Sequence, residues 1–233
     1  MTRAEGWLID LRGADRRWDD ASCRADLSAE ELRRAAGIRD REAAVTYVRA
    51  RSTVRRLLAR MLGESPAALR IASAPGGRPV LPDHPDSCVS WSRSAGVLLL
   101  AVRRGEPIGV DVEAVRPVRS GAAVLRTVYR KELPAGGFGE PETFFSAWTL
   151  LEAAVKATGR GLARGAHDVL LYRPPGARRY ALGGIRDGGA LPWSGRTDQF
   201  RAPGSAACFM TAVVARGPCA PVRLNAWQPG VHT

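Results

Sequence analysis

The chain has 233 residues, of which 45% are hydrophobic, so it is long enough to bury the core of one large domain or two small ones. Its 35 Lys and Arg residues exceed its 23 Asp and Glu residues, and the formal charge of +12 predicts attraction to anionic partners. No apolar run approaches the roughly 18 residues of a membrane span, and no secretory signal opens the chain, so we expect a cytoplasmic protein with no membrane attachment.

The cysteine pattern argues against a zinc site. The four cysteines lie far apart, with no Cys-x-x-Cys pair and no histidine cluster nearby, and they are Cys23, Cys88, Cys208 and Cys219. We therefore expect reduced thiols that are mostly packed.

The first elements in chain order are a short strand and two helices. Residues 6–11 read as a strand, and Ser28 with Glu31 has the spacing of a capping box, which predicts a helix start. A longer helix is expected from about residue 40 to residue 62, ended by Gly63. Arginines follow this helix away from its apolar side, and we expect most of them to form a solvated face: Arg49, Arg51, Arg55, Arg56 and Arg60.

Strands dominate the middle of the chain. Residues 75–79 are a Gly/Pro loop, residues 89–94 alternate as a strand, and residues 97–102 form an apolar run typical of a buried strand. The chain re-enters a strand at Ile108, so the strands at 97–102 and 108 are expected to pair as a hairpin.

The second half repeats the order of helices followed by strands. Helices are expected over 122–129 and 143–158, with Gly159 as the cap of the second, and a Gly/Pro-rich loop over 134–141. Strands follow at 169–172, 179–182 and 208–214, and the tail after Gly217 is expected to be weakly ordered. This order predicts an α+β protein of two similar α/β halves, each a small antiparallel sheet with helices.

Two carboxylates in the strand at 108–113 are candidates for a metal site. Asp111 and Glu113 lie at i, i+2, so both point to one face of the strand, while Val110 and Val112 point to the other. Magnesium takes oxygen ligands, commonly one or two carboxylates with phosphates and water. The alternative is a charged strand end or edge strand without a metal.

The helix at 143–158 carries a second group of candidate residues. Trp148, Glu152 and Lys156 follow one another at i, i+4 steps and so share one helical stripe. Glu152 could complete the metal site or accept a proton, and Lys156 could hold a phosphate oxygen. The alternatives are an exposed Glu to Lys pair and a core tryptophan. Similarly, Ser92 and Arg93 at their turn could donate to a phosphate or be an ordinary polar turn.

The order and spacing of four motifs resemble the 4′-phosphopantetheinyl transferase superfamily, in its longer, monomeric class. That family carries a Gly-Lys-Pro loop, a Ser-His-Ser turn, a Gly-Ile/Val-Asp-x-Glu strand, and a helix with Trp-Ser/Thr-x-Lys-Glu before Lys-x-x-Gly-x-Gly-Leu. The matching segments in this chain are residues 77–79, 92–94, 109–113 and 148–162. The arginine-bearing helix at 40–62 extends the resemblance weakly toward the N-terminus.

The resemblance implies a pseudo-twofold protein with coenzyme A and Mg²⁺ in the cleft between two halves. The N-terminal half, residues 1–107, would contact the nucleotide of coenzyme A, and the C-terminal half, residues 108–228, would hold the metal and the catalytic helix. The implied metal ligands are Asp111, Glu113 and Glu152, the catalytic residues Glu152 and Lys156, and the coenzyme-binding residues Arg78, Ser92, Arg93 and Lys156.

The activity implied by the resemblance is Mg²⁺-dependent transfer of the 4′-phosphopantetheine arm from coenzyme A to a serine of an acyl or peptidyl carrier protein. This reaction converts apo to holo carrier in fatty-acid or secondary-metabolite synthesis, including polyketides and nonribosomal peptides. A basic enzyme surface is compatible with an acidic carrier.

The chain departs from the family pattern at two positions. Arg93 replaces the histidine, and Leu151 replaces the lysine before the catalytic glutamate. If Leu151 is a handicap, Leu151→Lys should raise activity or coenzyme affinity. One alternative is therefore a catalytically drifted relative that binds carrier or coenzyme without transfer. A nucleic-acid-binding protein is a second alternative from the arginines alone, but the chain lacks the motifs of that class, so no nucleic-acid partner is expected.

Overall fold

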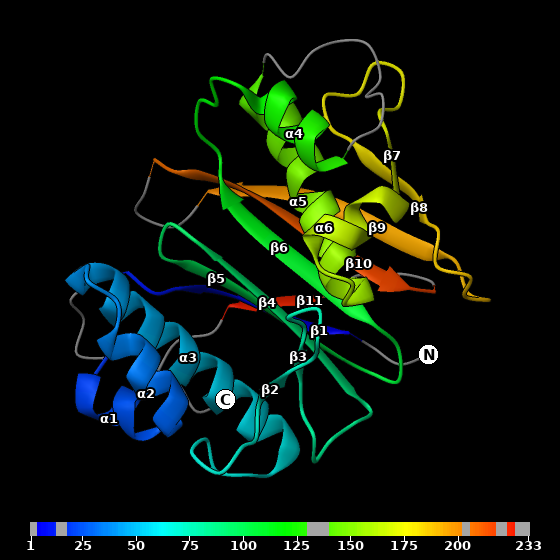
Figure 1. The fold of residues 1–233 in the computed structure, drawn as a ribbon. Helices are drawn as coiled ribbons and strands as arrows, with labels where there is room; N and C mark the ends of the chain where they lie inside the picture. Colours follow the sequence, from blue (N-terminus) through cyan, green and yellow to red (C-terminus); the bar gives the residue numbers. More distant parts are fainter. Residues whose placement is uncertain (1–3, 13–17, 130–139, 202–205, 218–222, 227–233) are drawn as a thin grey trace.

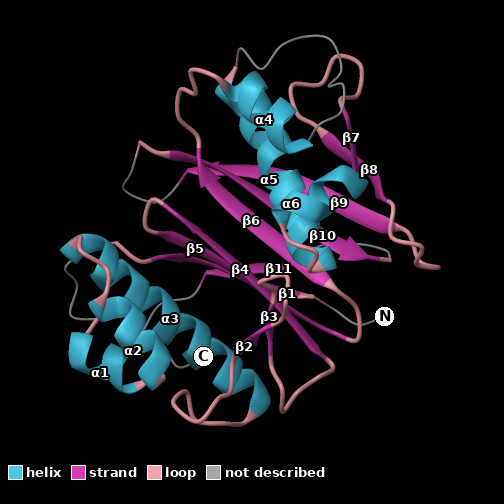
Figure 2. Ribbon diagram, viewed as in Figure 1, coloured by secondary structure: helices cyan, strands magenta, loops and turns pink. Residues whose placement is uncertain are grey.

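A computed structural model describes residues 4–12, 18–129, 140–201, 206–217 and 223–226 of the chain. The elements stack as helices, sheet, sheet and helices (Figures 1 and 2). The mixed α+β class with small antiparallel sheets is confirmed. The pseudo-twofold relation and the boundary between residues 107 and 108 stay predictions.

The first sheet has the strand order β11-β1-β5-β4. Its strands are β1 (Glu5–Asp10), β4 (Ser87–Ser94), β5 (Val97–Arg104) and β11 (Arg223–Ala226). Neighbouring strands run antiparallel except β1 and β11, which are parallel. Since β11 comes from the last part of the chain, the first sheet includes a strand from beyond residue 107, within a tail expected to be weakly ordered.

Three helices cover the outer face of this sheet: α1 (Asp20–Ala25), α2 (Ala29–Ala36) and α3 (Arg41–Leu62). The predicted capping box is confirmed, because Ser28 and Glu31 bond to each other's backbone N–H groups. Gly63 ends α3 in the left-handed conformation, with φ of 75°, as its position predicted. The sequence signals therefore located the start of α2 and the end of α3, whereas α1 was not predicted.

The second sheet has the order β6-β10-β9 and is antiparallel throughout. Its strands are β6 (Ile108–Ala114), β9 (Trp193–Arg201) and β10 (Cys208–Arg216). Its outer face is covered by α5 (Pro141–Thr158), with α4 (Gly121–Tyr129) beyond it. Strand β9 was not predicted, because it is a largely polar edge strand without a regular apolar alternation.

Shorter elements complete the fold. They are β2 (Ala72–Ser73) with β3 (Pro79–Val80), α6 (Leu162–Gly165), a 3-10 helix (Ala166–Asp168), and β7 (Val169–Tyr172) with β8 (Ala181–Ile185). The strand predicted at 179–182 is thus displaced to 181–185. Most of the loop predicted at 134–141 lies outside the described residues, as does Cys219.

The predicted hairpin between residues 97–102 and the strand at 108 is wrong. β5 pairs with β1 and β4, whereas β6 pairs with β10. The two strands instead pack face to face, with Leu99 of β5 and Val110 of β6 in one apolar cluster between the sheets. β5 is buried on both faces, since Leu98 and Leu100 point to the helices, which explains its uninterrupted apolar sequence.

The expected solvated arginine face of α3 is also wrong for most of its members. Arg55 is 2% exposed and its Nε donates to Glu31 of α2 at 2.6 Å. Arg56 donates to Asp26 at 2.6 Å, and Arg49 donates to the carbonyl of Leu11 at 2.9 Å. Arg55 and Arg56 thus join α3 to acids at the neighbouring helices, and Arg49 joins it to the segment after β1.

A very close contact joins β6 to α5. A Cβ atom on Gly109 would lie 2.0 Å from the carbonyl oxygen of Ala153 and 2.5 Å from the amide nitrogen of Ala157. A side chain of any size is therefore excluded at position 109 unless the helix moves. Small residues on both elements let the helix backbone approach the strand.

Leu151 lies in the apolar core cluster around α5 and is fully buried. Its neighbour Glu152 lines a cavity on another side of the helix. A lysine at position 151, where the family pattern has one, would therefore have its backbone and first side-chain atoms in the apolar core of this chain.

In the described parts of the chain, Cys23, Cys88 and Cys208 are free thiols, as the sequence predicted. None of the described helices is both long enough and apolar enough to cross a bilayer.

We predict that Gly109→Ala destabilises the protein by roughly 2 kcal/mol or more, because the added methyl overlaps the α5 backbone. Urea unfolding followed by circular dichroism measures the change. Gly37→Ala is the control, since Gly37 has φ of −79° and its new Cβ would lie 3.6 Å from the nearest atom. Equal stability for both variants would contradict the assigned contact.

We also predict that Leu151→Lys lowers stability instead of raising activity, because it places an ammonium group in an apolar core. A shift of about three pKa units for a buried lysine corresponds to about 4 kcal/mol. Thermal unfolding at pH 7 and pH 10 provides the measurement, and the deficit should shrink at the higher pH. Val124→Lys, at a position 40% exposed on α4, should leave the melting temperature nearly unchanged.

Candidate active site

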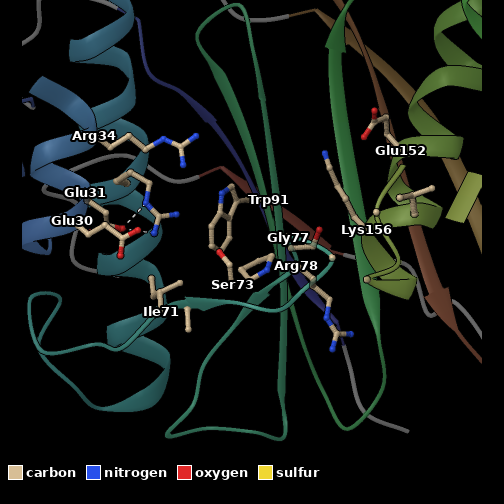
Figure 3. A pocket seen from close by; sticks show the side chains of 18 of the residues that line it. Glu30, Glu31, Arg34, Ile71, Ser73, Gly77, Arg78, Trp91, Glu152 and Lys156 are labelled. Carbon is tan, nitrogen blue, oxygen red and sulfur yellow. Dashed lines mark hydrogen bonds and ion pairs between the residues drawn. The ribbon is translucent and has the colours of Figure 1, made fainter. Parts of the chain in front are cut away.

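A cavity of about 690 Å³ lies between the N-terminal helices and strand β4 on one side and the C-terminal part of α5 on the other. Figure 3 shows its two sides: Glu31 and Arg34 stand on the side of the N-terminal helices, and Glu152 and Lys156 on the side of α5. The turn that links β2 to β3 forms part of the wall and includes Arg78. Polar and charged side chains from separate elements therefore converge on one hollow, which is typical of a ligand site.

The hydroxyl groups of β4 meet the carboxylates of β6 in matching steps. Ser92 donates to Asp111 at 2.6 Å, and Ser94 donates to Glu113 at 2.7 Å. Both pairs follow the i, i+2 spacing of a strand, so the expectation that Asp111 and Glu113 share one face is confirmed.

The same strand also supplies acceptors for the open edge of β6. The backbone N–H of Val110 donates to the Ser90 hydroxyl at 3.0 Å, and that of Ala114 donates to the Ser94 hydroxyl at 3.1 Å. These bonds satisfy buried backbone donors on a strand edge that has no strand partner among the described residues. They fix the position of β4 relative to β6 along the strand direction, and so the position of Asp111 and Glu113 relative to β4.

Lys156 joins α5 to this group. Its Nζ donates to Oδ1 of Asp111 at 2.7 Å and to the Ser92 hydroxyl at 3.0 Å. Asp111 is 3% exposed, whereas the Lys156 side chain is 30% exposed and lines the cavity. Glu152 lies one turn earlier on the same helix and lines the cavity too.

Burial and charge act in opposite directions on these acids. Burial raises the pKa of Asp111, with Lys156 and Ser92 opposing it and Glu113 adding to it. Burial likewise raises the pKa of Glu152; Lys156 opposes that rise, and Asp111 and Glu113 reinforce it. The three carboxylates are thus close enough to influence one another electrostatically.

The metal set named from sequence is not fully assembled. Within the described ranges, no group of three or more Asp, Glu, His or Cys side chains lies close enough to hold a metal ion. One observation does fit a hard cation: the Oδ2 atom of Asp111 is buried and has no hydrogen-bond partner in the part of the chain that the structure describes. Such an oxygen is free to bind a metal ion, and carboxylate oxygens are the type of ligand that Mg²⁺ prefers. The role of Asp111, Glu113 and Glu152 as ligands stays a prediction.

Arg78 and Arg93 lie in different hollows. Arg78 lines the cavity beside the end of α5, where a Cβ on Gly159 would lie 3.3 Å from its Nε. Arg93 is exposed on the opposite face of β4 from Ser92 and lines a shallow hollow near the start of α3 with Arg49. Their coenzyme contacts stay predictions, as does that of Ser92.

Trp148 is partly buried against the core of the second half and stacks on Phe144, with ring centroids 6.1 Å apart. The core interpretation of this residue is therefore confirmed. It shares a stripe with Glu152 and Lys156 but serves packing.

Several cavity residues were not singled out as site residues from sequence: Glu31, Arg34, Arg51 and Trp91. Glu31 was noticed as a helix cap, and Arg51 as one of a run of arginines. Their approach to Trp91 of β4 depends on helix packing against the sheet, for which the local sequence holds no signal.

Comparison with known proteins agrees with this geometry. A family model described as the 4′-phosphopantetheinyl transferase superfamily matches residues 107–208. The chain is 28% identical to the 4′-phosphopantetheinyl transferase HetI of Nostoc sp., over 68% of this chain and 69% of that protein.

Two further relatives carry related names. The 4′-phosphopantetheinyl transferase Sfp of Bacillus subtilis is 26% identical over 47% of this chain and 50% of its own length. The L-aminoadipate-semialdehyde dehydrogenase-phosphopantetheinyl transferase of Eremothecium gossypii is 31% identical over 68% of this chain and 62% of its own length. The chain thus spans between half and about two thirds of these relatives.

The segment that the family model matches contains both the strand of Asp111 and the helix of Glu152 and Lys156, the elements that the structure brings together beside the cavity. We conclude that the chain belongs to the 4′-phosphopantetheinyl transferase superfamily.

Proposed function

We propose that this protein transfers the 4′-phosphopantetheine arm of coenzyme A to a serine of an acyl or peptidyl carrier protein. The observation that carries the proposal is the bonded group of Lys156, Asp111 and Ser92, which reaches a polar cavity through Lys156, with Glu152 one turn away on the cavity wall. The names of the relatives support the same activity.

Glu152 is the proposed base. It accepts the proton of the carrier serine hydroxyl, directly or through a water, and the serine oxygen attacks the β-phosphate of coenzyme A. The bond from that phosphorus to the bridging oxygen breaks, and 3′,5′-ADP leaves with the electron pair. A pKa raised by burial makes Glu152 a better proton acceptor than an exposed glutamate.

Lys156 and Arg78 supply positive charge at the phosphates. Lys156 reaches the cavity from α5 and can balance the charge that grows on the diphosphate as the bond breaks. Arg78 lines the same cavity from the first half, where it can hold a phosphate of the nucleotide. This is catalysis by position and charge, and it needs no covalent enzyme intermediate.

Mg²⁺ is the proposed cofactor, and Asp111, Glu113 and Glu152 are the residues that would hold it. When bound, it would neutralise charge on the diphosphate. Meanwhile, Ser92 and Ser94 keep Asp111 and Glu113 oriented through their hydroxyl groups.

The carrier is the proposed protein partner. The chain has a net charge of +12, which would speed the encounter with an acidic carrier. Added salt would screen this attraction and slow the encounter.

The first test incubates the purified chain with an apo carrier protein, coenzyme A and Mg²⁺. We expect the carrier to gain the mass of one phosphopantetheine arm, as measured by intact mass spectrometry. A carrier that binds but gains no mass would instead indicate the drifted, binding-only relative.

The second test removes the proposed base. Glu152→Gln keeps the side-chain shape, so we expect transfer to fall roughly 10² to 10⁴-fold while the melting temperature stays close to wild type. Initial labelling rates provide the measurement. Glu142→Gln is the control on the same helix, because Glu142 pairs with Arg179 at 2.9 Å outside the cavity and should leave the rate unchanged. Near-normal turnover by Glu152→Gln would remove its assigned role.

A further inference from the structure

Trp91 is the larger of the aromatic side chains, Trp91 and Tyr47, in a cavity lined mostly by charged, small and polar side chains. It lies on β4 and packs partly against the N-terminal core, yet it remains part of the cavity wall. Figure 3 shows it between the side of Glu31 and Arg34 and the side of Lys156. A tryptophan in this place is available to a ligand.

The guanidinium of Arg51 covers the Trp91 ring, with its central carbon 4.8 Å from the ring centroid. This is within the distance of about 6 Å at which a cation and an aromatic face attract each other. Arg51 also lines the cavity, so the ring and the guanidinium present one stacked surface to it. Planar guanidinium and indole groups both stack well on a planar base.

A chain of ion pairs holds Arg51 in this place. Its Nε donates to Oε1 of Glu31 at 2.6 Å, and Arg55 donates to the other Glu31 oxygen at 2.6 Å. The backbone N–H of Ser28 also donates to Glu31, at 2.9 Å. Burial alone would raise the pKa of Glu31, but Arg51, Ser28 and Arg55 outweigh it and the pKa is lowered. Glu31 is therefore a fixed anion between two arginines.

Arg55 connects these ion pairs to the segment that leads to the other wall of the cavity. Its Nη1 donates to the carbonyls of Pro66 and Leu69, at 2.7 and 2.9 Å, in the segment that leads to Ile71 and then to the turn with Arg78. One buried arginine thus fixes both the stacked surface and the approach to the β2–β3 turn. A site whose support is this rigid needs little reordering when a ligand binds.

We propose that Trp91, held by Arg51, is the stacking subsite for the purine base of coenzyme A, and that Arg55 acts through Glu31 as its positioning residue. This inference rests on the proposed function, because it takes a nucleotide as the ligand of the cavity. It makes Trp91 a residue that selects among nucleotides, separate from the groups that act at the phosphates.

The test measures binding without transfer. Adenosine 3′,5′-bisphosphate and cytidine 3′,5′-bisphosphate are titrated separately into the full chain by isothermal calorimetry, since they carry the same phosphates on different bases. We expect wild type to bind the adenosine compound more tightly. Trp91→Leu should weaken it roughly tenfold and affect the cytidine compound much less, because the larger purine stacks better. Trp91→Tyr, which keeps an aromatic face, should retain most of the preference.

The positioning role is tested with a matched pair of substitutions. Lysine carries its donors on one nitrogen, so Arg55→Lys cannot occupy the separate places of Nε beside Glu31 and Nη1 beside the two carbonyls. We therefore expect the purine preference to fall toward that of Trp91→Leu. Arg56→Lys is the control, because Arg56 is the next residue but bonds Ser22 of α1 and Asp26 at its end, outside the Glu31 network. Melting temperatures for both variants separate loss of fold from loss of selectivity.

The outcomes are distinct. A Trp91→Leu protein that keeps the purine preference, or loses affinity equally for both nucleotides, would overturn the stacking subsite. A purine preference that is unchanged in Arg55→Lys would overturn the positioning role. If the wild-type protein binds neither nucleotide and does not label the carrier, the proposed function itself fails. If the wild-type protein labels the carrier but Trp91→Leu keeps the wild-type purine preference, only this inference fails.

Discussion

The close approach of β6 and α5 at Gly109 is the constraint on which the rest of the candidate site depends. Because position 109 has no side chain, the backbone of α5 near Ala153 and Ala157 can lie against the strand. The strand then presents Asp111 two residues later, and Lys156 of the helix reaches it at 2.7 Å. A wider separation would break this bond and leave a buried carboxylate without its cation, which is strongly unfavourable.

The second sheet is positioned against the first by polar contacts as well as by apolar packing. Leu99 and Val110 share the core between the sheets, while the hydroxyls of Ser90, Ser92 and Ser94 bond the neighbouring edge of β6. Apolar packing is tolerant of small displacements, but hydrogen bonds have a narrow range of distance and angle. The serine contacts therefore define where the acids lie, and the apolar core supplies most of the stabilisation.

The arginines of α3 show that a high net charge does not imply a uniformly solvated basic surface. Arg55 is buried, and both it and Arg51 share Glu31, so part of the chain's positive charge is neutralised inside the N-terminal half. Such a buried network is favourable only when its members are satisfied together. Here it also holds Arg51 against Trp91, which links the packing of α2 against α3 to the wall of the cavity.

Local signals in the sequence determined the start of α2 at the Ser28 capping box and the ends of α3 and α5 at Gly63 and Gly159. The alternation of β6 placed Asp111 and Glu113 on one face. These features depend on neighbours only a few residues away. Strand pairing was decided by the tertiary structure: β6 pairs with β10, about a hundred residues later, instead of with β5. Likewise, the burial of Leu151 and the contact of Arg51 with Trp91 depend on which helix face meets which sheet. Long-range packing selects among partners that the local pattern leaves equivalent, and so the tertiary structure alone built the cavity wall.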